Sequence, residues 1–439
     1  MKLDPLLDAL SGRFAGGRAV RAWRLYAADG RRVSLGVKDR DYGGPHAPLA
    51  LARSGGVRYL LVWDDGRVSR GYLERCHFEE SPSRALAEAL RAAYDDPDAA
   101  QVLGPTPLPE VELHDPATAA AVDGDLSLLA RRLDLVRERT AGDRVDTWSG
   151  SFSFGEGGFR LLTSAGFDES GCGTSFGWHV TLNGEASDGF SARAPEIDAA
   201  FEARLGRLLA RAGELSRPAA TIAAGIRPVV LAPRVVESYV LETLLANLDG
   251  STVSNGESHF RREQFGSGEP ILRDDMELRI DPLQPLRSGA YRCTREGVPA
   301  ARCSYITNGC LEHPVAGLKY ARRLGIRPTP VPYASDTLFF SGRRSLTETE
   351  SLERAAGGAL ILSVLGVHTQ DAASGDFSLS APQALGLTPA GFAGRLKATI
   401  SGNLFDLLSD PATEFVRFDG EHTPGLLVSC RLDPSEPTA

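Results

Sequence analysis

The sequence predicts an α+β fold: an N-terminal α+β domain with an antiparallel sheet and helices, followed by a β-rich C-terminal domain. Alternating apolar segments and amphipathic helical segments occur in separate runs, without strict strand–helix alternation. The 47 Gly and 27 Pro favour many turns and strands. A length of 439 residues exceeds the usual size of one hydrophobic core. We therefore expect domains over residues 1–220 and 221–439, with a connector near 105–116.

The net charge and the N-terminal sequence argue against a nucleic-acid-binding, secreted or membrane-spanning protein. A net charge of −9 argues against a dedicated nucleic-acid binder, which normally presents a basic face to phosphate. Asp4 and Asp8 interrupt the apolar core that a signal peptide needs, and no apolar run approaches the roughly 20 residues of a membrane span. We expect a cytoplasmic protein with neither a nucleic-acid nor a membrane partner. The six Cys lack close regular spacing and are interpreted as reduced thiols.

The first half is predicted to contain helices and an antiparallel meander. Asp29-Gly30 and Asp65-Gly66 are expected to form hairpin turns between strands. Four arginines, Arg131, Arg132, Arg137 and Arg139, are expected on the solvated face of their helix. Helices are expected within residues 1–20, 81–94, 126–140 and 197–215, and strands within 23–37, 59–63 and 148–192.

The second half is predicted to be dominated by strands. Asn308-Gly309 is the dipeptide most typical of a hairpin turn. Residues 357–380 combine an apolar run with a polar loop, and an ordinary β-turn explains that loop equally well. Strands are expected at 228–233, 277–280, 300–307, 309–311 and around 359–367, and helices at 234–248, 320–324 and 352–356.

Gly173-Thr174-Ser175-Phe176-Gly177 matches the G-x-S-x-G motif of α/β-hydrolases. That motif needs a strand before it and a helix after it, so that the turn exposes the serine hydroxyl. Residues 178–182 alternate like a strand instead. We therefore interpret the segment as a Gly-rich hairpin turn in preference to a nucleophile.

Cys293, Cys303, Cys310 and His313 form a possible zinc set, but their spacing lacks the close Cys pair of a zinc knuckle. Half-buried thiols on neighbouring strands explain the same residues. His259 and Glu263 could share one face of a helical turn, although catalytic zinc usually has three protein ligands, and a charged loop is the simpler interpretation. A P-loop is absent. The residues alone assign no activity.

Five blocks occur in one order in the C-terminal half: residues 226–235 (IRPVVLAPRV), 296–299 (EGVP) leading to the 308–309 turn, 319–325 (KYARRLG), 374–378 (SGDFS) and 398–404 (ATISGNL). In these blocks the chain resembles the TldD/TldE (PmbA) family, once described as modulators of DNA gyrase, and specifically its TldE/PmbA branch. The resemblance implies a heterodimeric zinc metallopeptidase that cleaves unfolded or extended peptides. In that assembly TldD supplies an H-E-x-x-x-H helix and a Cys ligand, with metal-activated water as the nucleophile.

The helix expected to carry H-E-x-x-x-H is residues 234–248, which contains Glu237 and Glu242 but no His. The resemblance therefore implies a non-metallated subunit: no catalytic residue and no metal or other cofactor in this chain, and zinc in a TldD-like partner. Cys430 lies in a strand-like run and is interpreted as a packing residue.

By resemblance, residues 374–378 correspond to a family loop near the chamber wall. The implied substrate loop consists of Ser374, Gly375, Asp376, Phe377 and Ser378, together with Gly402 and Asn403. Relatives read close to T-G-D-F-S-R-G-A-S-G-F, and this chain lacks the Arg-Gly pair. We expect Asp376 and Ser378 to shape the site without performing chemistry. The divergence indicates a specialised member, such as one that matures a peptide natural product or releases a product from a carrier protein.

Two further functions compete with the peptidase subunit. A stand-alone homodimer could use the same chamber to bind a peptide without cleaving it. The gyrase-modulator description is a third option, to which the acidic charge balance gives no support.

Overall fold

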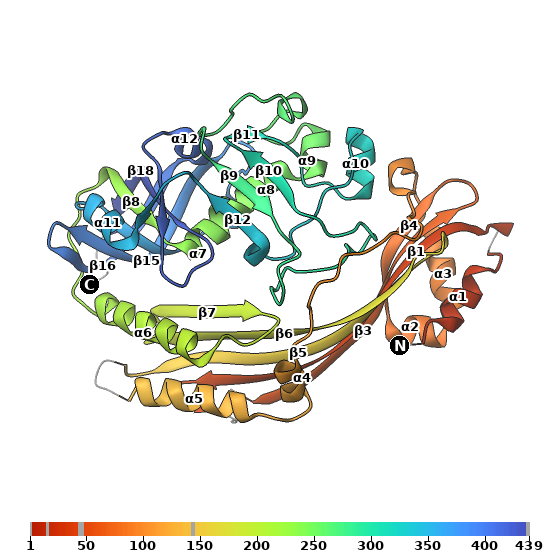
Figure 1. Ribbon diagram of the computed structural model, residues 1–439, viewed down its shortest axis with the longest axis horizontal. Helices are drawn as coiled ribbons and strands as arrows, with labels where there is room; N and C mark the ends of the chain where they lie inside the picture. Colours follow the sequence, from red (N-terminus) through yellow and green to blue (C-terminus); the bar gives the residue numbers. More distant parts are fainter. Residues whose placement is uncertain (1, 15–16, 43–47, 142–144, 436–439) are drawn as a thin grey trace.

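The computed structural model describes residues 2–14, 17–42, 48–141 and 145–435. The first half is built on one antiparallel sheet in the order β4-β3-β1-β5-β6-β7, with β2 attached to β1. Figure 1 shows its long strands curving along one side of the C-terminal half. The strands are β1 (Val20–Lys38), β2 (Asp41–Tyr42), β3 (Leu49–Trp63), β4 (Val68–Glu74), β5 (Trp148–Thr163), β6 (Asp168–Leu182) and β7 (Ala186–Ala192).

Helices pack against this sheet at both of its ends. Near the N-terminus, Leu6 and Leu10 enter a small core with Leu86 and Trp63. Towards the other end, Leu133 and Phe201 join the aromatic side chains of β5 and β6. The helices are α1 (Asp4–Leu10), α2 (Arg75–Glu80), α3 (Pro82–Arg91), η2 (Pro97–Ala99), α4 (Pro116–Val122), α5 (Ser127–Arg139) and α6 (Asp198–Leu215).

Two predicted turns of the first half are wrong. Asp29 and Gly30 lie inside β1, paired with β3 on one side and β5 on the other, and Gly173–Gly177 lies inside β6 opposite β5. The glycines lie opposite one another: Gly30 pairs with Gly157, which pairs with Gly173. Glycine inside a strand can mark a close approach of another backbone as well as a turn. Asp65-Gly66 does form the predicted turn, with Gly66 at φ 88°.

The C-terminal half contains two sheets. The smaller has the antiparallel order β11-β10-β9-β12, and Asn308 (φ 49°) and Gly309 (φ 73°) form the predicted hairpin turn between β10 and β11. In the other sheet β8 pairs with both β14 and β18, so that β8, β14, β15, β16 and β18 close into a barrel. The strands are β8 (Gly225–Leu231), β9 (Glu277–Ile280), β10 (Cys303–Thr307), β11 (Cys310–Leu311), β12 (Leu338–Ser341), β13 (Ser345–Thr347), β14 (Ala359–Leu365), β15 (Asp376–Thr388), β16 (Gly391–Asn403), β17 (Glu414–Arg417) and β18 (Gly425–Pro434).

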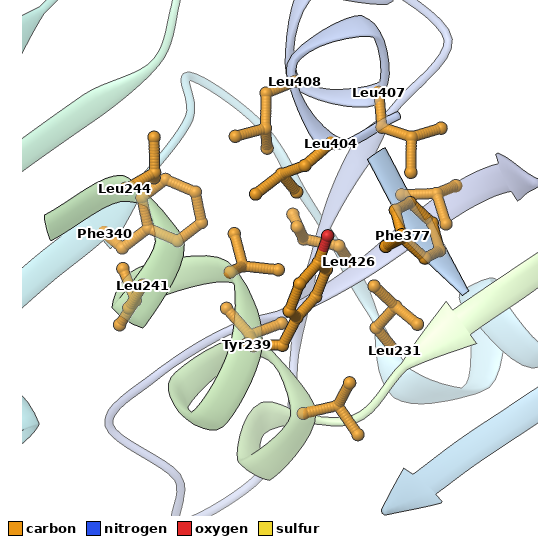
Figure 2. Close-up of a cluster of buried hydrophobic side chains, with 14 of the residues drawn as sticks. Leu231, Tyr239, Leu241, Leu244, Phe340, Phe377, Leu404, Leu407, Leu408 and Leu426 are labelled. Carbon is orange, nitrogen blue, oxygen red and sulfur yellow. The ribbon is translucent and has the colours of Figure 1, made fainter. Parts of the chain in front are cut away.

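The predicted helix at 234–248 exists but is not uniform. It begins as α7 (Pro233–Val235), continues as a π-helical segment, η3 (Val236–Leu241), and ends as α8 (Glu242–Leu248). Tyr239 of η3 points into the core beside Phe377, Leu404 and Leu426 (Figure 2). The other helices are α9 (Gly250–Asn255), η4 (Arg262–Gln264), α10 (Leu318–Leu324), η5 (Ser335–Thr337), α11 (Glu348–Arg354), η6 (Val367–Thr369) and α12 (Leu404–Ser409).

The mixed α+β class predicted from the sequence is confirmed. Each sheet stays on one side of residue 220, but two hydrophobic clusters contain residues from both sides: Phe201 and Leu205 share a core with Leu360, Leu385 and Leu427, and a small core joins the first half to Cys293. None of the helices in the described ranges combines the length and apolar character that a membrane span requires.

Candidate functional site

A cavity of about 680 Å³ lies between the sheet of the first half and the helix that begins at Pro233. On one side it is lined by β6, by β7 and by α6, which contribute His179, Asp188 and Arg204. On the other side, the C-terminal half contributes Arg234 and Glu237 from the helix, and Arg287, Asp336, Glu421 and His422 from loops and η5. The lining therefore combines these polar side chains with apolar ones, such as Phe190 and Leu362, and is assembled from segments far apart in the sequence.

A second cavity of about 400 Å³ adjoins the first along the same helix, since both are lined by Arg234, Glu237 and Ser335. Glu242 and Tyr333 also line it. The opposite side of the helix is apolar and buried, with Val236, Val240 and Leu244 each at 0% exposure. Because the apolar side of the helix is buried in the core, its polar side, with Arg234 and Glu237, faces the cavities.

The carboxylates of the 680 Å³ cavity are held by hydrogen bonds from the protein. Asp188 accepts a hydrogen bond from the Gly189 amide at 2.7 Å, and Asp336 accepts one from the Gly289 amide at 2.9 Å. Glu237 accepts a hydrogen bond from the Thr423 hydroxyl at 2.6 Å. Glu421 accepts one from the Arg204 guanidinium at 3.1 Å. Burial raises the pKa of Glu421, and the charge of Arg204 partly offsets that effect.

Two histidines face the same cavity from opposite halves of the chain. Burial, reinforced by Arg234, lowers the pKa of His179 below its ordinary value. Burial also lowers the pKa of His422, despite the hydrogen bond that its Nε2–H donates to the Leu338 carbonyl at 2.8 Å. Because a carbonyl can only accept, Nε2 carries the proton and Nδ1 of His422 is left as an acceptor. Both shifts favour the neutral form of the imidazole.

The helix presents Glu237 and Glu242 to these cavities and contains no His or Cys. A zinc site uses Cys, His and carboxylate ligands, whereas Arg234 brings a positive charge to the cavity and Glu237 is bonded to Thr423. Across the described ranges, no group of three or more His, Cys, Asp or Glu side chains is positioned to hold a metal ion. Cys293 lies in a small core with Leu161 and Phe167, whereas Cys303 and Cys310 lie on the β10–β11 hairpin.

The residues of the implied substrate loop come together at the junction of β15 and β16. Asp376 pairs with Asn403, and Phe377 pairs with Gly402. The Asn403 side chain donates to the Ser374 carbonyl and to the Asp376 carboxylate, both at 2.9 Å, and accepts from the first amides of α12. None of these loop residues lines the two cavities described above. Their role in substrate binding stays a prediction.

The individual loop residues have different surroundings. Phe377 is 6% exposed, and its ring centroid lies 5.4 Å from that of Tyr239, so it is a core residue (Figure 2). Gly375 has φ 75°, and a Cβ there would lie 2.4 Å from the Phe405 ring. The side chains of Asp376 and Ser378 are exposed.

Residues 257–263, predicted to be a charged loop, support this segment. The His259 ring stacks on Phe405 with centroids 3.7 Å apart, and Nδ1 lies 3.2 Å from the Ala373 carbonyl. Asn247 at the end of α8 donates to the Ala372 carbonyl at 2.7 Å. Glu263 lies in η4. The loop is therefore fixed to the same helix that borders the cavities.

Sequence reasoning missed most of the cavity. Glu237 was singled out because of its helix, but His179, Arg287, Asp336 and His422 are single polar residues without a spacing pattern. Only the fold brings them together.

The chain is similar to known proteins in the sequence of its C-terminal half and in its fold. Residues 224–429 match the model of the PmbA/TldA metallopeptidase C-terminal domain. No curated protein matches the sequence. Among solved structures, a protein of Bacteroides thetaiotaomicron described as a candidate modulator of DNA gyrase has a TM-score of 0.77 at 18% identity, covering 99% of this chain and 97% of its own.

Two further structures have the same fold. A candidate gyrase modulator of Thermotoga maritima has a TM-score of 0.75 at 19% identity, covering 94% of this chain and 96% of its own. TldE from Thermococcus kodakarensis has a TM-score of 0.73 at 17% identity, covering 94% of this chain and 97% of its own. At these identities the likeness concerns the fold.

Proposed function

We propose that this chain is the non-metallated, TldE-like subunit of a cytoplasmic two-chain zinc peptidase, because residues 224–429 match the PmbA/TldA metallopeptidase C-terminal domain and the fold is shared with TldE. The observation that carries the proposal is the helix running from Pro233 to Leu248. It borders two cavities with Arg234, Glu237 and Glu242 and contains no His. The metal and the general base therefore come from a TldD-like partner carrying H-E-x-x-x-H.

The role of this chain's own residues is to bind and orient an extended peptide. When bound in the partner, zinc would activate the water that attacks the peptide bond. Arg234, Glu237 and the neutral His179 offer hydrogen bonds along a cavity large enough for several residues of a peptide. The loop at 374–378, held by Asn403, shapes the site without supplying chemistry.

The proposal is tested by expressing the chain alone and together with a TldD-like chain from the same genome. We expect the two to co-purify, with about one zinc per heterodimer and cleavage of an unfolded peptide by the pair only. The matched control is the pair whose TldD-like chain has its motif Glu replaced by Gln, which should keep zinc and lose cleavage.

Two outcomes contradict the proposal in different ways. Stoichiometric zinc and full activity in the isolated chain would show that this subunit is itself catalytic. A stable homodimer that binds peptides, ignores the TldD-like chain and cleaves nothing would favour the stand-alone peptide-binding protein.

A further inference from the structure

Each lining carboxylate of the 680 Å³ cavity already accepts a hydrogen bond from the protein, whereas several of its arginines make no ion pair among the described residues. Each lining carboxylate accepts a hydrogen bond from a backbone amide, from Thr423 or from Arg204. Arg204 is surrounded by carboxylates, with Glu421 at 3.1 Å and Asp188 and Glu196 at 3.7 Å. It is therefore committed to the protein itself.

Among the described lining arginines, Arg211, Arg234 and Arg287 have no ion pair. Arg211 acts electrostatically on the buried carboxylates of Glu348 and Glu421, which leaves Arg234 and Arg287 for a ligand. Among the described residues, neither guanidinium has a carboxylate within ion-pair distance, and Arg234 has only the Ser187 hydroxyl at 3.4 Å. Each guanidinium presents five N–H donors in a planar fork that matches a carboxylate. Their donors therefore face the cavity available to a ligand.

Each of these arginines has a neutral imidazole nearby, since Arg234 acts electrostatically on His179 and Arg287 on His422. Within the described lining, the four arginines Arg204, Arg211, Arg234 and Arg287 balance the four carboxylates in formal charge. Because these charges balance, the cavity has no large net charge that would attract anions from a distance. Recognition would depend on short, directed hydrogen bonds.

We propose that this cavity binds a peptide carboxylate, with Arg234 and Arg287 as its ligands. The inference deepens the proposed function, on which it rests, by naming the substrate class: peptides that present either a free C-terminal carboxylate or a Glu or Asp side chain. His179 orients the same group as an uncharged partner. A phosphate could bind the same donors, but an unmodified peptide carries carboxylates and no phosphate.

The test measures binding of fluorescein-labelled penta-alanine to the complete, isolated chain by fluorescence anisotropy. One probe has a free C-terminal carboxylate and the second has a C-terminal amide. Two further amidated probes carry Glu or Gln at the central position, which separates a side-chain carboxylate from a terminal one. We expect at least one carboxylate probe to bind about tenfold more tightly than its neutral counterpart.

Arg234→Gln and Arg287→Gln should each reduce that preference to less than about threefold, measured as the ratio of the affinities for the charged and the neutral probe. Arg84→Gln on α3 is the matched control, because Arg84 is exposed and paired with Glu88 in the N-terminal helices. Far-UV circular dichroism and the thermal midpoint identify any variant that misfolds. If Arg234→Gln misfolds, Arg287→Gln and the four wild-type affinities still decide the question.

Equal affinities for charged and neutral probes would overturn the proposal, as would no binding of any probe by the chain or by its complex with the TldD-like partner. Other outcomes separate this inference from the proposed function. Cleavage by the heterodimer without any carboxylate preference would remove this inference alone. A carboxylate preference in a chain that never forms a zinc peptidase would remove the proposed function alone.

Discussion

At the scale of single residues, Arg132 departs most clearly from its sequence pattern. It was expected on the solvated face of its helix with its neighbours, but its side chain is 1% exposed. The guanidinium stacks on Phe201 at 4.3 Å and reaches Asp198 at 3.1 Å, while Nε and Nη1 have no hydrogen-bond partner. Unmet buried donors offset much of what the ion pair contributes.

This balance predicts different costs for two substitutions at one position. Arg132→Met should change the free energy of unfolding by less than about 1 kcal/mol, because it keeps the packing and removes the unmet donors. Arg132→Ala should lower it by about 2–4 kcal/mol by leaving a cavity. Urea unfolding measures both.

Arg131→Ala on the exposed side of α5 is the control and should stay within about 0.5 kcal/mol of the wild-type chain. If Arg132→Ala costs no more than this control, the side chain contributes no packing and the argument from burial is wrong.

At the scale of elements, glycine-rich segments were interpreted as turns where the structure has continuous strands. The glycines of β1, β5 and β6 instead accommodate other parts of the chain. A Cβ on Gly157 would lie 2.6 Å from the Asp29 carbonyl, and one on Gly173 would lie 2.7 Å from Arg193. The same composition that permits a turn permits close approach, and only the neighbouring strands distinguish the two.

The loop at 374–378 gives a prediction at this scale. Asp376 and Ser378 have exposed side chains, and Asp376 makes one side-chain hydrogen bond, to Asn403, among the described contacts. The double substitution Asp376→Ala and Ser378→Ala should therefore cost at most about 1 kcal/mol of stability. If the loop shapes the substrate site, kcat/KM of the heterodimer should fall about tenfold.

Ser380→Ala provides the control for the loop, because Ser380 is exposed on the same side of β15 but lies outside the predicted site. It should leave both stability and kcat/KM unchanged. An active double variant with unaltered peptide affinity would show that the loop is an ordinary turn.

At the scale of the whole molecule, the two halves meet around shared apolar and polar groups. Phe201 and Leu205 from α6 share a core with Leu360 and Leu385 of the C-terminal sheet. The 680 Å³ cavity lies at the same junction, with His179 from one half and His422 from the other. Changes at the cavity are therefore coupled to how the halves pack.

Protonation at this junction should lower stability. The folded pKa values of His179 and His422 lie below the ordinary value of 6.5, so the unfolded chain binds more protons as the pH falls through 6.5. Their contribution is complete above pH 6.5 and is lost below it. Between pH 7.5 and 5.5, we expect the wild-type chain to lose more of its free energy of unfolding than a variant with His179→Asn and His422→Gln.

The comparison with this variant is essential because Glu196, Glu348 and Glu421 have raised pKa values and act in the opposite sense, favouring the folded chain as the pH falls. Urea unfolding at the two pH values measures the difference, in which the glutamate effects cancel. Parallel pH profiles for the two proteins would show that neither histidine is perturbed by folding.

The sequence by itself determined the fold class, most helices and strands, the Asn308-Gly309 turn and the family resemblance, because local periodicity and ordered blocks express these directly. Only the tertiary structure decided that Arg132 is buried, that the glycines at 30 and 173 lie within strands, and that His179, Arg287 and His422 line one cavity. The physical reason is that burial and convergence depend on contacts between residues remote in sequence, which no local pattern encodes.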